Sequence, residues 1–131
     1  MRTIALIAGI VILCGAAAPA KDNRDALTKA LDGRIAGTPT NCIDPHLSDG
    51  PQIIDNRTIL YRETGRRLWR ADLPDACPAL RPMNTIIVKM YGSQLCRNDT
   101  FRVLEPGTTI PSSICRFGKF TPYDKPPAPK R

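Results

Sequence analysis

The sequence predicts a small, mainly β protein: a disulfide-stapled antiparallel sheet or partly open barrel, preceded by one short N-terminal helix. Short runs of branched and aromatic residues recur between Gly, Pro, Asn and Asp, as expected for strands joined by turns. Four cysteines follow a signal-like N-terminus, which favours disulfides. Helical periodicity appears in one short stretch after that N-terminus, so we expect a single helix.

Residues 1–20 have the pattern of a signal peptide. A basic start precedes an apolar run of about ten residues, too short to span a bilayer, and the Ala-Pro-Ala sequence at residues 18–20 fits the cleavage rule. We therefore expect a mature chain that begins at Lys21, is periplasmic or secreted, and has no transmembrane segment. Lipidation of Cys14 is the alternative, but the residue before that cysteine is the bulky Leu13.

Residues 21–41 are predicted to hold a short helix and a linker. Asn23 is of the residue type that caps helices, and Gly33 favours a helix end. Leu27 and Leu31 lie one turn apart and form an apolar stripe. A helix of about ten residues is marginal alone, so this stripe must dock on the domain that follows.

Residues 42–122 are predicted to form the disulfide-stapled β domain. The expected strands lie at residues 51–55, 57–63, 66–73, 84–91, 100–105 and 116–120. The strongest local signal is a hairpin across the second and third of these, with a turn near Gly65. Residues 123–131 form a charged, proline-rich tail that is predicted to be disordered.

Trp69, the only tryptophan in the chain, is predicted to be a core residue. The strand period puts Trp69 on the same face as Ala71 and Leu73, while Arg70 and Asp72 point to the opposite, wet face. Buried aromatic residues commonly anchor small cores. A platform for a ligand is the alternative interpretation, and the indole N–H needs a partner in either case.

The four cysteines of the mature chain are an even set, suited to two disulfides in an oxidising compartment. Their spacing lacks the Cys-x-x-Cys pairs of zinc sites, so we expect no metal and no other cofactor. Four cysteines allow three pairings. We expect Cys77 to bond Cys96 and Cys42 to bond Cys115, because the one strand between Cys77 and Cys96 can bring both to the same end of the sheet.

Four motifs occur in order: "CI" at Cys42, "DNRTILY" leading to "LWRADLP" and Cys77, "LCRNDTFRV", and "CRFGKFTP" from Cys115. This four-cysteine framework, with its terminal Cys-x-x-Gly-x-Phe-x-Pro, resembles a family of short exported proteobacterial proteins known only as a domain of unknown function. The resemblance spans residues 25–122. It implies the fold and export, and it implies no mechanism.

The chain is basic, with 19 lysines and arginines against 12 acidic residues and a net charge of +7. A positive field raises the local concentration of anionic partners, so we expect an anionic envelope component or an acidic protein as partner. Export argues against nucleic acid. The predicted binding residues lie on the wet face of the hairpin and are Arg62, Arg66, Arg67 and Arg70.

Catalytic residue sets are scarce in this sequence. His46 is the one histidine, paired cysteines leave no thiol nucleophile, and neither a Gly-x-Ser-x-Gly turn nor a phosphate-binding glycine loop is present. His46 lies between Asp44 and Asp49 in a predicted loop. We therefore expect a non-catalytic binding module of the cell envelope. A small secreted enzyme or enzyme inhibitor that uses the His46 loop is the alternative.

Overall fold

The computed structural model describes residues 21–63 and 65–130, and the predicted signal peptide, with Cys14, lies outside them. Within these residues the chain forms one α-helix, antiparallel sheets that do not close into a barrel, and two disulfides. The predicted fold class is therefore confirmed. No helix in this part of the chain is long and apolar enough to cross a bilayer.

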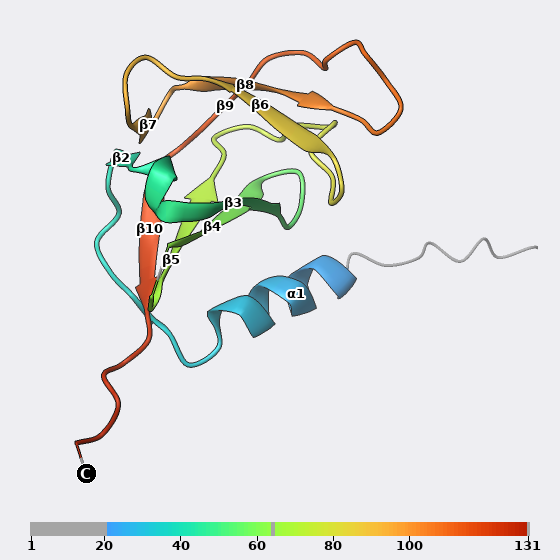
Figure 1. Cartoon of the computed structure of the whole chain (residues 1–131). Coiled ribbons are helices and arrows are strands. Elements are labelled where there is room, and N and C mark those ends of the chain that lie inside the picture. The colour runs from blue at the N-terminus through green and yellow to red at the C-terminus, as the bar shows by residue number, and fades with distance from the viewer. Residues whose placement is uncertain (1–20, 64, 131) are drawn as a thin grey trace, which may run out of the picture.

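The larger sheet has the strand order β1-β10-β5-β4-β3 and forms the middle layer of the molecule (Figure 1). Its strands are β1 (Ile35–Ala36), β3 (Ser48–Ile53), β4 (Thr58–Glu63), β5 (Arg67–Asp72) and β10 (Phe120–Asp124). The predicted hairpin is confirmed, because β4 pairs with β5 and Tyr61 lies opposite Trp69. Strand β10 returns from the end of the chain to pair with the other side of β5.

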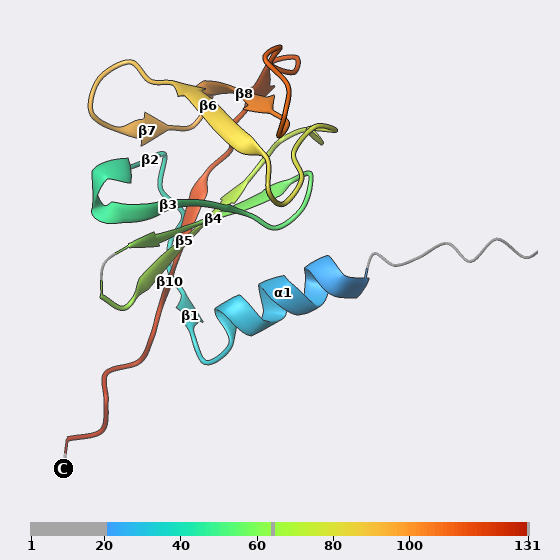
Figure 2. The same cartoon turned by 45° about the vertical axis from the view of Figure 1, so that its right-hand side comes forward.

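Helix α1 (Lys21–Leu31) covers one face of the larger sheet (Figures 1 and 2). Leu27 and Leu31 pack against Leu60 and Leu68, which are fully buried. The predicted docking of the apolar stripe is therefore confirmed. The prediction of a cap at Asn23 is wrong, because that residue already lies within the helix.

The smaller sheet, with the strand order β6-β8-β9, covers the opposite face of the larger one (Figure 2). Its strands are β6 (Thr85–Lys89), β8 (Thr100–Leu104) and β9 (Cys115–Arg116). A short ladder of β2 (Cys42–Ile43) and β7 (Leu95–Cys96) lies beside it, and the 3₁₀ turn η1 (Pro45–Leu47) links β2 to β3. The main hydrophobic core fills the space between the two sheets.

The terminal Cys-x-x-Gly-x-Phe-x-Pro motif builds this core. Phe117 and Phe120 are fully buried, and the Phe117 ring lies 4.6 Å from that of Phe101 between centroids. A side chain at Gly118 would overlap the backbone carbonyl of Asp72, so the motif glycine permits a close approach to β5. The glycine and the phenylalanines of this segment are thus explained by packing.

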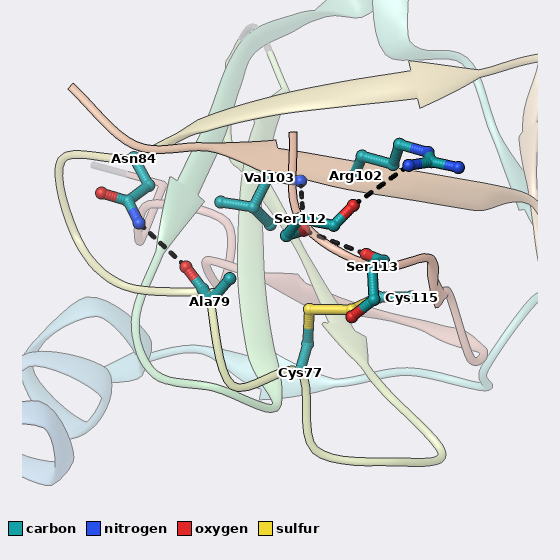
Figure 3. Close-up of a disulfide and its surroundings, with 8 residues drawn as sticks. All are labelled: Cys77, Ala79, Asn84, Arg102, Val103, Ser112, Ser113 and Cys115. Carbon is teal, nitrogen blue, oxygen red and sulfur yellow. Dashed lines mark hydrogen bonds between the residues drawn. A yellow bond between two sulfur atoms is a disulfide. The ribbon is translucent and has the colours of Figure 1, made fainter. Parts of the chain in front are cut away.

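The cysteine pairing differs from the predicted one. Cys42 bonds Cys96. Cys77 bonds Cys115, as Figure 3 shows. The prediction was wrong because it overlooked the two-residue ladder of β2 and β7, in which Cys42 lies directly opposite Cys96. Cys77 is instead buried in the core, from which it reaches Cys115 in the smaller sheet.

The C-terminal strand also differs from the prediction of one strand at residues 116–120. The chain forms β9 and β10 there, and β10 continues to Asp124, into the predicted tail. Pro122 lies within this strand, between β5 and β1. Its carbonyl accepts from the backbone N–H of Gly37 at 2.8 Å, so its backbone groups face the β1 side and its missing N–H removes no bond of the ladder with β5.

Candidate functional site

The four hairpin arginines do not share one wet face, contrary to the prediction. Both faces of the hairpin are covered, since Leu60 and Leu68 on the supposed wet face are buried under α1. Side chains alternate along a strand, so Arg70 lies on the helix side with Leu68, whereas Arg67 lies on the core side, above the Trp69 ring. The arginines are therefore divided between two faces.

Arg67 and Arg70 are occupied by ion pairs. Arg67 donates from Nε and Nη2 to the two carboxylate oxygens of Asp124, each at 2.8 Å. This bidentate hydrogen bond raises the pKa of Arg67 and lowers the pKa of Asp124. Arg70 donates from Nε to Asp72, also at 2.8 Å. Both arginine side chains therefore form ion pairs within the larger sheet.

Trp69 lies at the edge of the core. It is partly buried and packs against the core cluster that includes Tyr61 and Ala71. Its indole N–H donates to Oε2 of Glu63 at 2.6 Å, and the Arg67 guanidinium lies 5.3 Å from the ring centroid. Groups of the protein itself thus satisfy the indole and cover the ring, which favours the core interpretation over a ligand platform.

Arg62 belongs to a different feature, a groove of about 450 Å³ between α1 and the larger sheet, which we call the basic groove. Ala26, Ala30 and Gln52 contribute to its walls. Its charged lining residues come from three segments of the chain and are Lys29, Asp32, Arg34, Arg62 and Lys125. The lining of the groove thus contains four cations and one carboxylate.

Arg34 connects three segments of the chain that border the groove. Its Nε donates to the carbonyl of Ala30 at 3.2 Å, and its Nη1 donates to the carbonyls of Arg66 at 2.6 Å and Tyr123 at 3.3 Å. In the described part of the chain these bonds leave Nη2 without a protein acceptor. Arg34 therefore holds the helix end against the hairpin turn.

The backbone of Arg66 lies beside the groove, because its carbonyl also accepts from the backbone N–H of Lys125 at 3.2 Å, although its side chain is not among the lining residues. The structure therefore brings Arg62 and Arg66, of the four predicted arginines, next to cations that sequence reasoning missed. The missed residues are Lys29, Arg34 and Lys125. Arg34 had one signal, its position directly after the helix-ending Gly33.

The His46 loop shows no cluster of chemical groups. His46 is exposed, and Asp44 caps the 3₁₀ turn by accepting the backbone N–H of His46 at 2.9 Å. Within residues 21–63 and 65–130, no three His, Cys, Asp or Glu side chains are grouped closely enough to hold a metal ion. The carboxylate next to His46 therefore has a structural role in the turn.

These observations define a small, disulfide-bonded antiparallel β domain with a basic groove beside its helix. The chain belongs to DUF6491, a family of unknown function, which it matches over residues 1–128. The predicted membership of a family of unknown function is thus confirmed. No curated protein and no solved structure matches the chain significantly.

Proposed function

We propose that the protein is an exported, non-catalytic binding module whose basic groove binds an anionic group of the cell envelope. The observation that carries the proposal is the convergence of four cationic side chains on one groove, namely Lys29, Arg34, Arg62 and Lys125. Arg67 and Arg70, by contrast, are matched by carboxylates of the same sheet. The excess charge of the groove is therefore available to a ligand.

The chemistry of the lining residues favours a phosphate or carboxylate ligand. Guanidinium groups such as those of Arg34 and Arg62 donate in a planar fork that fits these anions, and ammonium groups add point charges. The groove volume of about 450 Å³ is in the range of small-molecule sites. We therefore expect it to accept one charged headgroup or one acidic side chain of a partner.

Export is supported by the N-terminal pattern and by the disulfides. Disulfides form and persist in oxidising compartments such as the bacterial periplasm. The described residues contain two disulfides, Cys42–Cys96 and Cys77–Cys115. A basic protein in that compartment meets anionic lipids and glycans, which are the partners the groove fits.

The proposal can be tested by capture from an envelope extract, with proteins and lipids identified by mass spectrometry. The test variant replaces three groove cations and the neighbouring Arg66 by glutamine and leaves Arg34, which has structural bonds, unchanged: Lys29→Gln, Arg62→Gln, Arg66→Gln and Lys125→Gln. The control carries the same charge change at exposed cations elsewhere: Arg57→Gln, Arg81→Gln, Arg97→Gln and Lys119→Gln.

We expect the wild type and the control to retain the same anionic component, and the groove variant to lose it. Each exposed charge contributes only about 0 to 1 kcal/mol, so the combined change is needed. Equal retention by the groove variant and the wild type at low salt would contradict the proposal. Equal loss in both variants would indicate that net charge alone, and not the groove, causes binding.

A further inference from the structure

Strand β6 lies at a free edge of the smaller sheet, since its one ladder partner in the described chain is β8. The side to which each backbone N–H and C=O group of β6 points follows from its pairing with β8. Val103 uses its N–H and C=O toward Ser112, on the side away from β6 (Figure 3). Residues alternate in an antiparallel ladder, so Ile86, which lies opposite Val103, and Val88 turn their N–H and C=O groups to the open edge.

Apolar side chains are concentrated around this edge. Of the eight large apolar side chains that are exposed in the described part of the chain, four lie within residues 83–91. They are Met83 at 88% exposure, Ile87 at 45%, Met90 at 37% and Tyr91 at 76%. Ile87 lies at the centre of this segment, and the other three lie at its two ends.

We propose that β6 pairs with β6 of a second copy of this chain, antiparallel and symmetric about Ile87. In this register Ile87 lies opposite Ile87 of the second copy, and Ile86 opposite Val88, whose outward N–H and C=O groups then bond each other. Met83 and Tyr91 belong to the segments that flank the strand, so at each end the segment of Met83 in one copy faces the segment of Tyr91 in the other. One symmetry axis thus satisfies the outward backbone groups of the edge and brings the two Ile87 side chains together.

The charges of the strand favour a second copy as the occupant. Lys89 is the charged residue of β6, and the symmetric register places it opposite Thr85. Like charges directly opposite each other destabilise a strand pair, and this register avoids that arrangement. The edge is therefore self-complementary in its backbone groups and its apolar residues, and the register places no like charges directly opposite each other.

The contact involves one short strand from each copy, so it is small. Weak and transient interfaces are those below about 1,200 Å² in total. We therefore expect a dimer that dissociates at micromolar protein and forms at the high local concentration of a crowded envelope. Pairing of the two smaller sheets would join them into one continuous sheet.

The first test measures amide exchange and sedimentation of the oxidised protein from micromolar to millimolar concentration. We expect a shift from monomer to dimer, and slower exchange at high concentration for the amides of Ile86 and Val88. The amides of Ile87 and Lys89 already bond β8, so their exchange should change little. A monomer at every concentration, or a dimer without protection of Ile86 and Val88, would overturn the proposal.

The second test uses Ile87→Lys, which places two ammonium groups opposite each other on an exposed face without opening the core. We expect dimerisation to weaken by about tenfold or more. Val88→Pro removes an outward donor and should act in the same direction while the β6 to β8 ladder remains. Both variants must show the wild-type circular dichroism spectrum, so that loss of folding is distinguished from loss of pairing.

Ile114→Lys is the matched control, because Ile114 is an exposed isoleucine, at 58%, in the pocket that Ile87 also lines. We expect it to leave dimerisation unchanged. An equal effect of Ile114→Lys would assign the contact to the open face of the sheet and overturn the proposed register. A second contradicting result would be a protein that binds anionic vesicles without forming a dimer. If Ile87→Lys and Ile114→Lys abolished that binding equally, the proposed register would be overturned.

Discussion

The indole Nε1 of Trp69 lies 2.6 Å from Oε2 of Glu63, and the two residues belong to adjacent strands of one hairpin. Arg67 lies over the same indole ring. Contacts within the protein therefore hold Trp69 at the edge of the core. This relationship leads to a first prediction about stability.

Trp69→Ala should lower the free energy of unfolding by about 3 kcal/mol, because it removes partly buried ring surface and leaves Glu63 without its donor. Trp69→Phe keeps a ring and loses the N–H, so we expect a smaller cost of about 1 kcal/mol. Urea unfolding followed by far-ultraviolet circular dichroism measures both. A Trp69→Ala protein of wild-type stability would contradict the core interpretation.

Tyr61 lies opposite Trp69 in the hairpin, and its phenol side chain is buried. Its hydroxyl has no hydrogen-bond partner among the described residues, and burial raises its pKa. Tyr61→Phe should therefore increase the free energy of unfolding by about 1 kcal/mol, because a buried and unsatisfied polar group is removed. Tyr91→Phe, at an exposed tyrosine, is the control and should change stability little. A loss of stability in Tyr61→Phe would show that the hydroxyl has a partner.

A single tryptic digest, analysed by mass spectrometry without reduction, can identify the disulfide pairing. Trypsin separates the four cysteines onto the peptides 35–57, 71–89, 90–97 and 103–116, since a proline follows Arg81. Without reduction we expect 35–57 joined to 90–97, and 71–89 joined to 103–116. Replacing either pair by serine should cost about 2 to 5 kcal/mol. A peptide that joins Cys77 to Cys96 would contradict the observed topology.

Gly118 tests the packing role of the C-terminal motif. Gly118→Ala places a methyl group against the Asp72 carbonyl, so we expect a loss of at least about 2 kcal/mol from overpacking. Gly33→Ala is the comparison, because Gly33 has a positive φ of 65° and open space around it. It should cost about 1 kcal/mol. Equal thermal stability of Gly118→Ala and the wild type would contradict the close approach.

Much of the fold could be predicted because its signals are local. The hairpin follows from alternation on both sides of Gly65, and the helix follows from the stripe of Leu27 and Leu31. The ladder of β2 and β7 has two residues in each strand, so it carries no period, and its pairing depends on contacts across the chain. The disulfide prediction failed for that reason.

The candidate site was predicted only in part, again because distant segments meet there. Leu60 and Leu68 alternate with Arg62 and Arg70, so the face taken as wet was half apolar. That pattern and an unpartnered helical stripe together indicate that the helix docks on this face. Lys125 could not be placed from the sequence, because its position depends on β10 continuing past a proline.

The central claim is that the basic groove binds an anion, and an NMR titration with inorganic diphosphate tests it most directly. Diphosphate serves as the simplest probe for a phosphorylated headgroup. With millimolar diphosphate we predict saturable shifts at Lys29, Arg34, Arg62 and Lys125, which weaken as salt is added because the attraction is electrostatic. The variant with Lys29, Arg62, Arg66 and Lys125 changed to glutamine should lose these shifts, while the charge-matched control should keep them. Shifts spread over all basic residues of the surface, or no shift at the groove, would contradict the account.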